Sequence, residues 1–215
     1  MRQLLISIAP FLALSALFLF TGFFLILMTE KNALHFAINQ MVDENWNHFF
    51  RVITHLGDGI TAIILIVITA FFTKQKLANL SFGVLVFATS GLLTQFLKRF
   101  FFSDIKRPLG VFQNHELNWV PNIDLHTSFS FPSGHSTTAF ATFIVLAFYF
   151  RKQSKLQILF AFLAIITAFS RVYLSQHFTE DIVTGGFIGI ITFVSLFMAL
   201  KNVNFFKKAF EIDLA

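Results

Sequence analysis

Two short stretches of the sequence place a histidine beside groups that bind anions. The first reads Pro-Ser-Gly-His over residues 132–135, and in the second Ser-Arg at 170–171 is followed by five residues, His177, three residues and Asp181. Each stretch adjoins an apolar segment of roughly the length that crosses a bilayer. The combination indicates phosphate chemistry at a membrane surface.

The two histidines are candidates for the reacting groups. His177 and Asp181 are four residues apart, so on the first turn of a helix they share a face and the carboxylate can orient the imidazole. An oriented neutral histidine is a competent nucleophile or base. His135 belongs to a different helix and can protonate a leaving oxygen.

The groups around these histidines are suited to holding a phosphate. Ser133 and Gly134 begin a predicted helix and offer free backbone N–H groups at its positive end. Arg107 and Arg171 can each bind two phosphate oxygens. Histidine and aspartate are also zinc ligands, but the two arginines would repel a divalent cation. We therefore predict a site without a metal ion.

The composition is that of a membrane protein. Of 215 residues, 56% are hydrophobic and 13% are charged, 33 are phenylalanine, and the mean hydropathy is +0.73. Cysteine is absent, which excludes disulfides and thiolate metal sites. The formal charge of +5 does not indicate nucleic-acid binding, because the basic residues lie between apolar runs and do not form a polar surface.

Apolar runs of about 20 residues predict an all-α fold, a bundle of six transmembrane helices in a single domain that spans residues 1–215. The first run is longer than the core of a signal peptide and no cleavage site follows it, so we expect it to be retained. The six expected spans are 3–28, 53–73, 77–100, 131–150, 156–175 and 182–200.

The connections between spans predict the orientation in the membrane. The side that holds 74–76, 151–155 and both termini carries nine Lys and Arg residues, and the other side carries seven, several of them in the motifs above. The positive-inside rule then places both termini in the cytoplasm. Because the helices alternate in direction, all the residues of the candidate site emerge on the opposite, extracytoplasmic side.

The motifs resemble those of the type 2 phosphatidic acid phosphatase superfamily, which includes bacterial membrane lipid phosphatases and, on a soluble scaffold, vanadium haloperoxidases. Its pattern has three parts: a lysine, six residues and Arg-Pro; Pro-Ser-Gly-His; and Ser-Arg, five residues, His, three residues and Asp. The second and third parts match at every defined position. In the first part Phe100 stands where the lysine is expected, and we assign Lys98, with Arg99 and Lys106 as alternatives.

This resemblance implies a phosphatase that needs no metal ion and no cofactor. His177 would form a phosphohistidine, Asp181 would support it, and His135 would be the acid. Phosphate would be held by Lys98, Arg107, Ser133, Gly134 and Arg171.

The implied substrate is a lipid phosphate or pyrophosphate at the outer face of a bacterial inner membrane. Undecaprenyl pyrophosphate, phosphatidylglycerophosphate, phosphatidic acid and lipid A phosphates are all candidates. Phosphotransfer to an alcohol is an alternative, and a vanadate-dependent haloperoxidase or a non-enzymatic transporter or scaffold fits the six spans and the motifs less well. We infer no obligate protein partner.

Three further expectations concern the outer side. Residues 30–50 predict an amphipathic helix, either on the membrane surface or packed on the bundle. Asp58 is expected to cap the helix that follows it, with a place in the site cavity as the alternative. The histidines outside the two motifs are expected to be structural: His35, His48, His55, His115 and His126.

Overall fold

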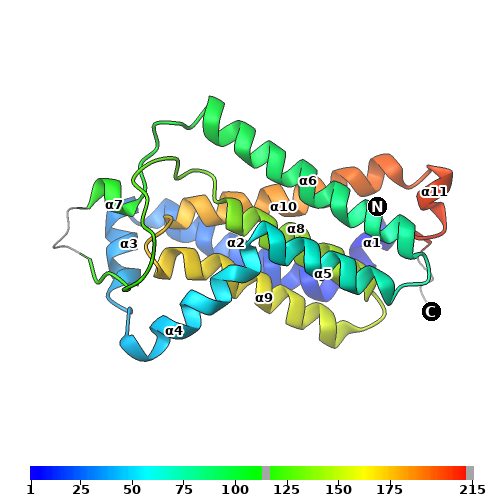
Figure 1. Ribbon diagram of the computed structural model, residues 1–215, viewed down its shortest axis with the longest axis horizontal. Coiled ribbons are helices and arrows are strands. Elements are labelled where there is room, and N and C mark those ends of the chain that lie inside the picture. Colours follow the sequence, from blue (N-terminus) through cyan, green and yellow to red (C-terminus); the bar gives the residue numbers. More distant parts are fainter. Residues whose placement is uncertain (113–116, 212–215) are drawn as a thin grey trace.

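The computed structural model describes residues 1–112 and 117–211, and the regular elements in these ranges are helices. They form an elongated bundle, in which α3, α4 and α7 gather at one end and α1 and α11 lie at the other (Figure 1). The elements in chain order are α1 (Arg2–Ser7), α2 (Ala9–Met28), α3 (Lys31–Asn39), α4 (Glu44–Ile53), the 3₁₀ helix η1 (Thr54–Gly57), α5 (Gly59–Phe71), α6 (Lys76–Phe100), α7 (Pro108–Val111), α8 (Gly134–Tyr149), α9 (Ser154–Tyr173), α10 (Thr179–Leu200) and α11 (Asn204–Lys207).

Within the described ranges, four helices are long and apolar enough to cross a membrane: α2, α6, α9 and α10. A fifth span is possible if the segments Glu44–Gly57 and Gly59–Phe71, which meet at a bend of 66°, are counted as one. The predicted spans at 53–73 and 131–150 form the shorter helices α5, with 13 residues, and α8, with 16. The count of six spans therefore stays a prediction.

Helix α8 occupies the centre of the bundle and packs against α5, α6, α9 and α10. Its residues from Ser136 to Tyr149 are almost all buried, with Phe140, Phe143 and Phe148 fully enclosed. A helix that is apolar on every side belongs in a protein interior or in a membrane, and for α8 the neighbouring helices supply the cover. The central position of α8 fixes its N-terminus, which begins at the Pro-Ser-Gly-His stretch.

Glycines in α10 allow this helix to approach α8 closely. A Cβ atom at Gly185 would lie 2.5 Å from the carbonyl oxygen of Ser133, and one at Gly189 would lie 2.8 Å from that of Thr137. Small residues at a helix interface permit such contact between backbones. The start of α10, which carries Asp181, is thereby held against the start of α8.

The region predicted as one amphipathic helix, 30–50, instead forms α3 and the first part of α4, separated by a short break. Both pack on the bundle: α3 contacts α2, α9 and α10, and α4 contacts α9 and η1. Leu34, His35 and Asn39 are buried on the inner face of α3. Packing on the bundle, one of the two expected arrangements, is therefore confirmed.

Candidate active site

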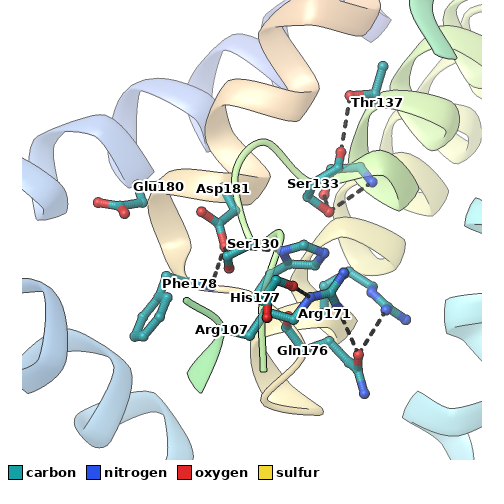
Figure 2. Close-up of polar contacts among 12 residues, drawn as sticks. Arg107, Ser130, Ser133, Thr137, Arg171, Gln176, His177, Phe178, Glu180 and Asp181 are labelled. Atoms are coloured by element: carbon teal, nitrogen blue, oxygen red, sulfur yellow. Dashed lines mark hydrogen bonds and ion pairs between the residues drawn. The ribbon is translucent and has the colours of Figure 1, made fainter. Parts of the chain in front are cut away.

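The predicted pair of His177 and Asp181 is formed at the start of α10. The Nδ1 atom of His177 lies 3.0 Å from Oδ2 of Asp181, and both side chains are almost fully buried. The same carboxylate oxygen accepts hydrogen bonds from the backbone N–H of Phe178 at 2.9 Å and from the hydroxyl of Ser130 at 2.5 Å (Figure 2). Asp181 is thus fixed from three sides, and it presents one oxygen to the imidazole.

The chain between α9 and α10 explains why five residues separate Arg171 from His177. The backbone N–H groups of Gln176 and His177 both donate to the carbonyl of Arg171, at 2.9 and 3.1 Å. This closed turn brings the guanidinium and the imidazole to the same cavity. Burial, and then the positive charges of Arg107 and Arg171, hold the pKa of His177 well below its usual range. The lowered pKa favours the neutral imidazole, and Nε2 is the ring nitrogen that does not face Asp181.

Arg107 and Arg171 are joined by a residue that the motifs do not include. Oε1 of Gln176 accepts from Nη1 of Arg107 at 3.1 Å and from Nη2 of Arg171 at 3.5 Å (Figure 2). The Nη1 atom of Arg171 also donates to the hydroxyl of Thr54 at 2.7 Å. Two like charges are thus held together by neutral acceptors, an arrangement suited to an anion between them.

Lys98 lies in the last turn of α6 and lines the same cavity as the two arginines, with only 7% of its surface exposed. Arg99 and Lys106 are exposed and do not line this cavity. Among the described residues, no carboxylate lies within ion-pair distance of Lys98, Arg107 or Arg171. The structure therefore brings Lys98, and neither alternative, to the site.

Ser133 and Gly134 differ in their positions. Gly134 lines the cavity, whereas Ser133 is fully buried and does not. The side chain of Ser133 caps α8 by accepting from the N–H of Ser136 at 3.4 Å, and its own N–H donates to the carbonyl of Asp181 at 3.0 Å. The prediction of a free N–H at Ser133 is therefore wrong, because the close contact with α10 supplies an acceptor.

The cavity has a volume of about 630 Å³, and it is lined by both predicted catalytic histidines. Three histidines expected to be structural also line it, namely His48, His55 and His126. His35 is buried, with Nε2 lying 3.3 Å from the hydroxyl of Ser175, so its structural role is confirmed; burial lowers its pKa to about 4. His115 lies outside the described residues.

Asp58 occupies the N-cap position of α5, but its side chain makes no capping hydrogen bond. Its carboxylate lines the cavity and lies 2.8 Å from Nε2 of His135 and 2.7 Å from Nδ1 of His55. The expectation that Asp58 caps the helix is therefore wrong, and the alternative of a place in the cavity is confirmed. Each of the two imidazoles contacts one carboxylate oxygen of Asp58, and neither oxygen accepts from the backbone of α5.

Together these features define a class: a helical protein with membrane-length helices and a cation-lined cavity that contains both motif histidines. Comparisons with known proteins agree. The sequence model of the PAP2 superfamily matches residues 78–205. Phosphatidylglycerophosphatase B of Bacillus subtilis (strain 168) is 32% identical in an alignment of 164 residues that covers 71% of this chain and 75% of that protein.

Two solved structures share the fold. Aquifex aeolicus LpxE gives a TM-score of 0.67 with 24% identity, over 78% of this chain and 94% of that one. A transmembrane PAP2 type phosphatidylglycerolphosphate phosphatase from Bacillus subtilis gives 0.62 with 25% identity, over 91% and 98%.

The chain therefore belongs to the PAP2 superfamily. It is an integral membrane protein and an enzyme, a hydrolase of the membrane lipid phosphatase type.

Proposed function

We propose that the protein removes the terminal phosphate from a lipid monophosphate or pyrophosphate through a phosphohistidine formed at His177. One observation carries this proposal: Lys98, Arg107 and Arg171 surround a cavity beside a neutral histidine and have no ion-paired carboxylate in the described chain. Burying cations without counter-ions costs free energy. A phosphate dianion would supply the missing negative charge.

The reaction has two steps. Nε2 of His177 attacks phosphorus, the bond from phosphorus to the lipid oxygen breaks, and His135 gives its proton to that oxygen. Water then attacks the phosphohistidine, His135 takes the proton of the water, and the bond from phosphorus to nitrogen breaks to release inorganic phosphate. Asp181 holds Nδ1 of His177, 3.0 Å away, and stabilises the positive charge that develops on the ring.

The phosphate is held by side chains that face the cavity. Lys98, Arg107 and Arg171 would bind its non-bridging oxygens and stabilise the charge of the transition state. Gly134 adds the N-terminal end of α8, where backbone N–H groups favour anions. Ser133 would contribute indirectly, because its hydroxyl fixes the start of the helix that presents Gly134.

For the substrate, we favour phosphatidylglycerophosphate. The curated relative at 32% identity and one of the similar structures both carry names of phosphatases for this lipid. The cavity is also lined by Arg51, His48 and His126, in addition to the three proposed phosphate-binding cations in the motifs. A lipid with a second phosphate group near the first would use these additional donors.

We further infer a single membrane-embedded domain over residues 1–215, with α5 and α8 as the second and fourth of six spans. The short basic connections at 74–76 and 151–155 favour the cytoplasm of a bacterial inner membrane for the end that carries α1 and α11. The cavity lies at the other end and would open on the extracytoplasmic side.

The test is phosphate release by the purified protein in detergent from phosphatidylglycerophosphate, phosphatidic acid and undecaprenyl pyrophosphate. We expect His177→Ala to abolish turnover while the protein stays extractable and monodisperse, because no other nucleophile replaces the imidazole. Substrate with a radiolabelled terminal phosphate should transiently label the wild type and leave His177→Ala unlabelled. Steady turnover by His177→Ala would refute the proposal.

A further inference from the structure

A short segment before α5 contacts two of the motif residues, although it lies outside residues 78–205, which the family comparison covers. At its start, in η1, Thr54 accepts a hydrogen bond from Arg171 at 2.7 Å. At its end, Asp58 contacts His135 at 2.8 Å. One turn of chain thus reaches both a phosphate-binding cation and the proposed acid.

The backbone of the same turn closes against the imidazole of His135. A Cβ atom at Gly57 would lie 2.9 Å from Cβ of His135, closer than real side chains approach, and 3.1 Å from its Cδ2 atom. The ring is therefore confined by Gly57 along one edge and bound through Nε2 by Asp58. The nitrogen that remains for the substrate is Nδ1.

The charge of Asp58 matters because the motif residues that line the cavity beside His135 include three cations, Lys98, Arg107 and Arg171. An acid must carry its proton when the bond from phosphorus to oxygen breaks, and nearby positive charges disfavour an imidazolium. Asp181, the other carboxylate beside a motif histidine, is buried and bound to His177. The charged and titratable groups that share the cavity with His135 are His48, Arg51, His55, Asp58, Lys98, Arg107, Asp124, His126, Arg171 and His177.

We propose that Asp58 is a positioning residue for the acid step. It holds Nε2 of His135, turns Nδ1 towards the leaving oxygen and stabilises the protonated ring. The inference rests on the proposed role of His135 as the acid, and it adds a second pair of histidine and carboxylate to the site. His177 and Asp181 form the pair that serves the nucleophile, and His135 and Asp58 form the pair that serves the leaving group.

The experiment compares two substrates that differ in their need for an acid. The leaving group of a lipid phosphate is an alkoxide, which is a poor leaving group and needs protonation. The leaving group of 4-nitrophenyl phosphate is a stable aryl oxide, which needs little protonation. Asp58→Asn keeps the size of the side chain and removes its charge. We expect kcat for the lipid to fall roughly tenfold or more and kcat for the aryl phosphate to change less than about threefold.

Two comparisons make the result specific. His135→Ala should show the same split between the two substrates, and Asp58→Asn added to His135→Ala should cause no further loss on the lipid. The matched control is Asp104→Asn, which changes an exposed aspartate outside the cavity and should leave both rates unaltered. Asp58→Glu keeps the charge and should retain more lipid activity than Asp58→Asn.

The inference and the proposed function fail in different ways. Equal losses on both substrates from Asp58→Asn, no loss on either, or an additive loss in the double variant would overturn the role of Asp58. If Asp58→Asn does not fold, lipid-selective loss in Asp58→Glu is expected and an equal loss on both substrates would overturn the inference. Absence of a split in His135→Ala itself would instead overturn the proposed acid, and the role of Asp58 with it.

Discussion

The assignment of Lys98 is the sharpest point to test, because the chain carries an alternative lysine eight residues further on. Lys98 is 7% exposed and lines the cavity, whereas Lys106 is exposed and lies outside it. The variants Lys98→Ala and Lys106→Ala each remove one ammonium group, the first from the buried cavity and the second from the exposed surface. Only the first removes a donor that can reach a phosphate in the cavity.

The size of the effect follows from the lost interaction. A hydrogen bond that involves a charged group contributes about 1.5–3 kcal/mol, which corresponds to a loss in kcat/KM of roughly tenfold to hundredfold for Lys98→Ala. Lys106→Ala should remain within about twofold, because exposed charges outside the site contribute little. Removing Lys98 also relieves repulsion with Arg107 and Arg171, so the melting temperature should stay level or rise while activity falls.

The assay is phosphate release from a lipid phosphate in detergent, with thermal unfolding of each variant measured in the same detergent. A fall in both activity and melting temperature for Lys98→Ala would mean that the lysine supports the fold. A loss of activity on substitution of Lys106 or Arg99, with full activity in Lys98→Ala, would refute the assignment of Lys98 to the first motif. The assignments of His135, His177 and Asp181 do not depend on this outcome.

Two other predictions address the anion site and the orientation. Vanadate and inorganic phosphate should inhibit competitively and raise the melting temperature, because they bind the folded cavity, and chelators should leave activity intact; strict dependence on an added divalent cation would contradict the mechanism. In intact cells, an impermeant thiol reagent should label Asp104→Cys and should not label Gln153→Cys, since the two positions are exposed at opposite ends of the bundle; the reverse pattern would refute the proposed sidedness.

The sequence predicts those parts of the site that depend on local spacing. His177 and Asp181 are four residues apart, and the turn after Arg171 is closed by its own backbone hydrogen bonds, so their geometry is contained in a single stretch of chain. Lys98 could be chosen over Lys106 only provisionally, because spacing does not reveal which side chain points inward. Burial and the shared cavity supply that information.

The sequence does not predict contacts between residues that are far apart in the chain and lie outside the motifs. Ser130 donates to Asp181, Thr54 accepts from Arg171, and no pattern of residue types marks either one. Gln176 adjoins His177, but nothing in its type or spacing indicates that it bridges two arginines. The prediction of a free N–H at Ser133 was wrong for the same reason, because the carbonyl that accepts from it belongs to Asp181 in α10.

The neutral groups around the arginines leave their positive charge available to an anion. A carboxylate between Arg107 and Arg171 would neutralise them and compete with phosphate, whereas the amide oxygen of Gln176 holds them in place and leaves their charge available. Hydrogen bonds to Gln176 and Thr54 offset part of the free energy cost of keeping these cations together, and a bound anion would offset more of it. Inorganic phosphate would do so as well as the lipid would, so escape of the product competes with the same attraction that draws in the substrate. The proposed mechanism therefore predicts that the lipid gains contacts outside the phosphate site. Arg51 and His48, which line both this cavity and the neighbouring one, are the candidates for these contacts.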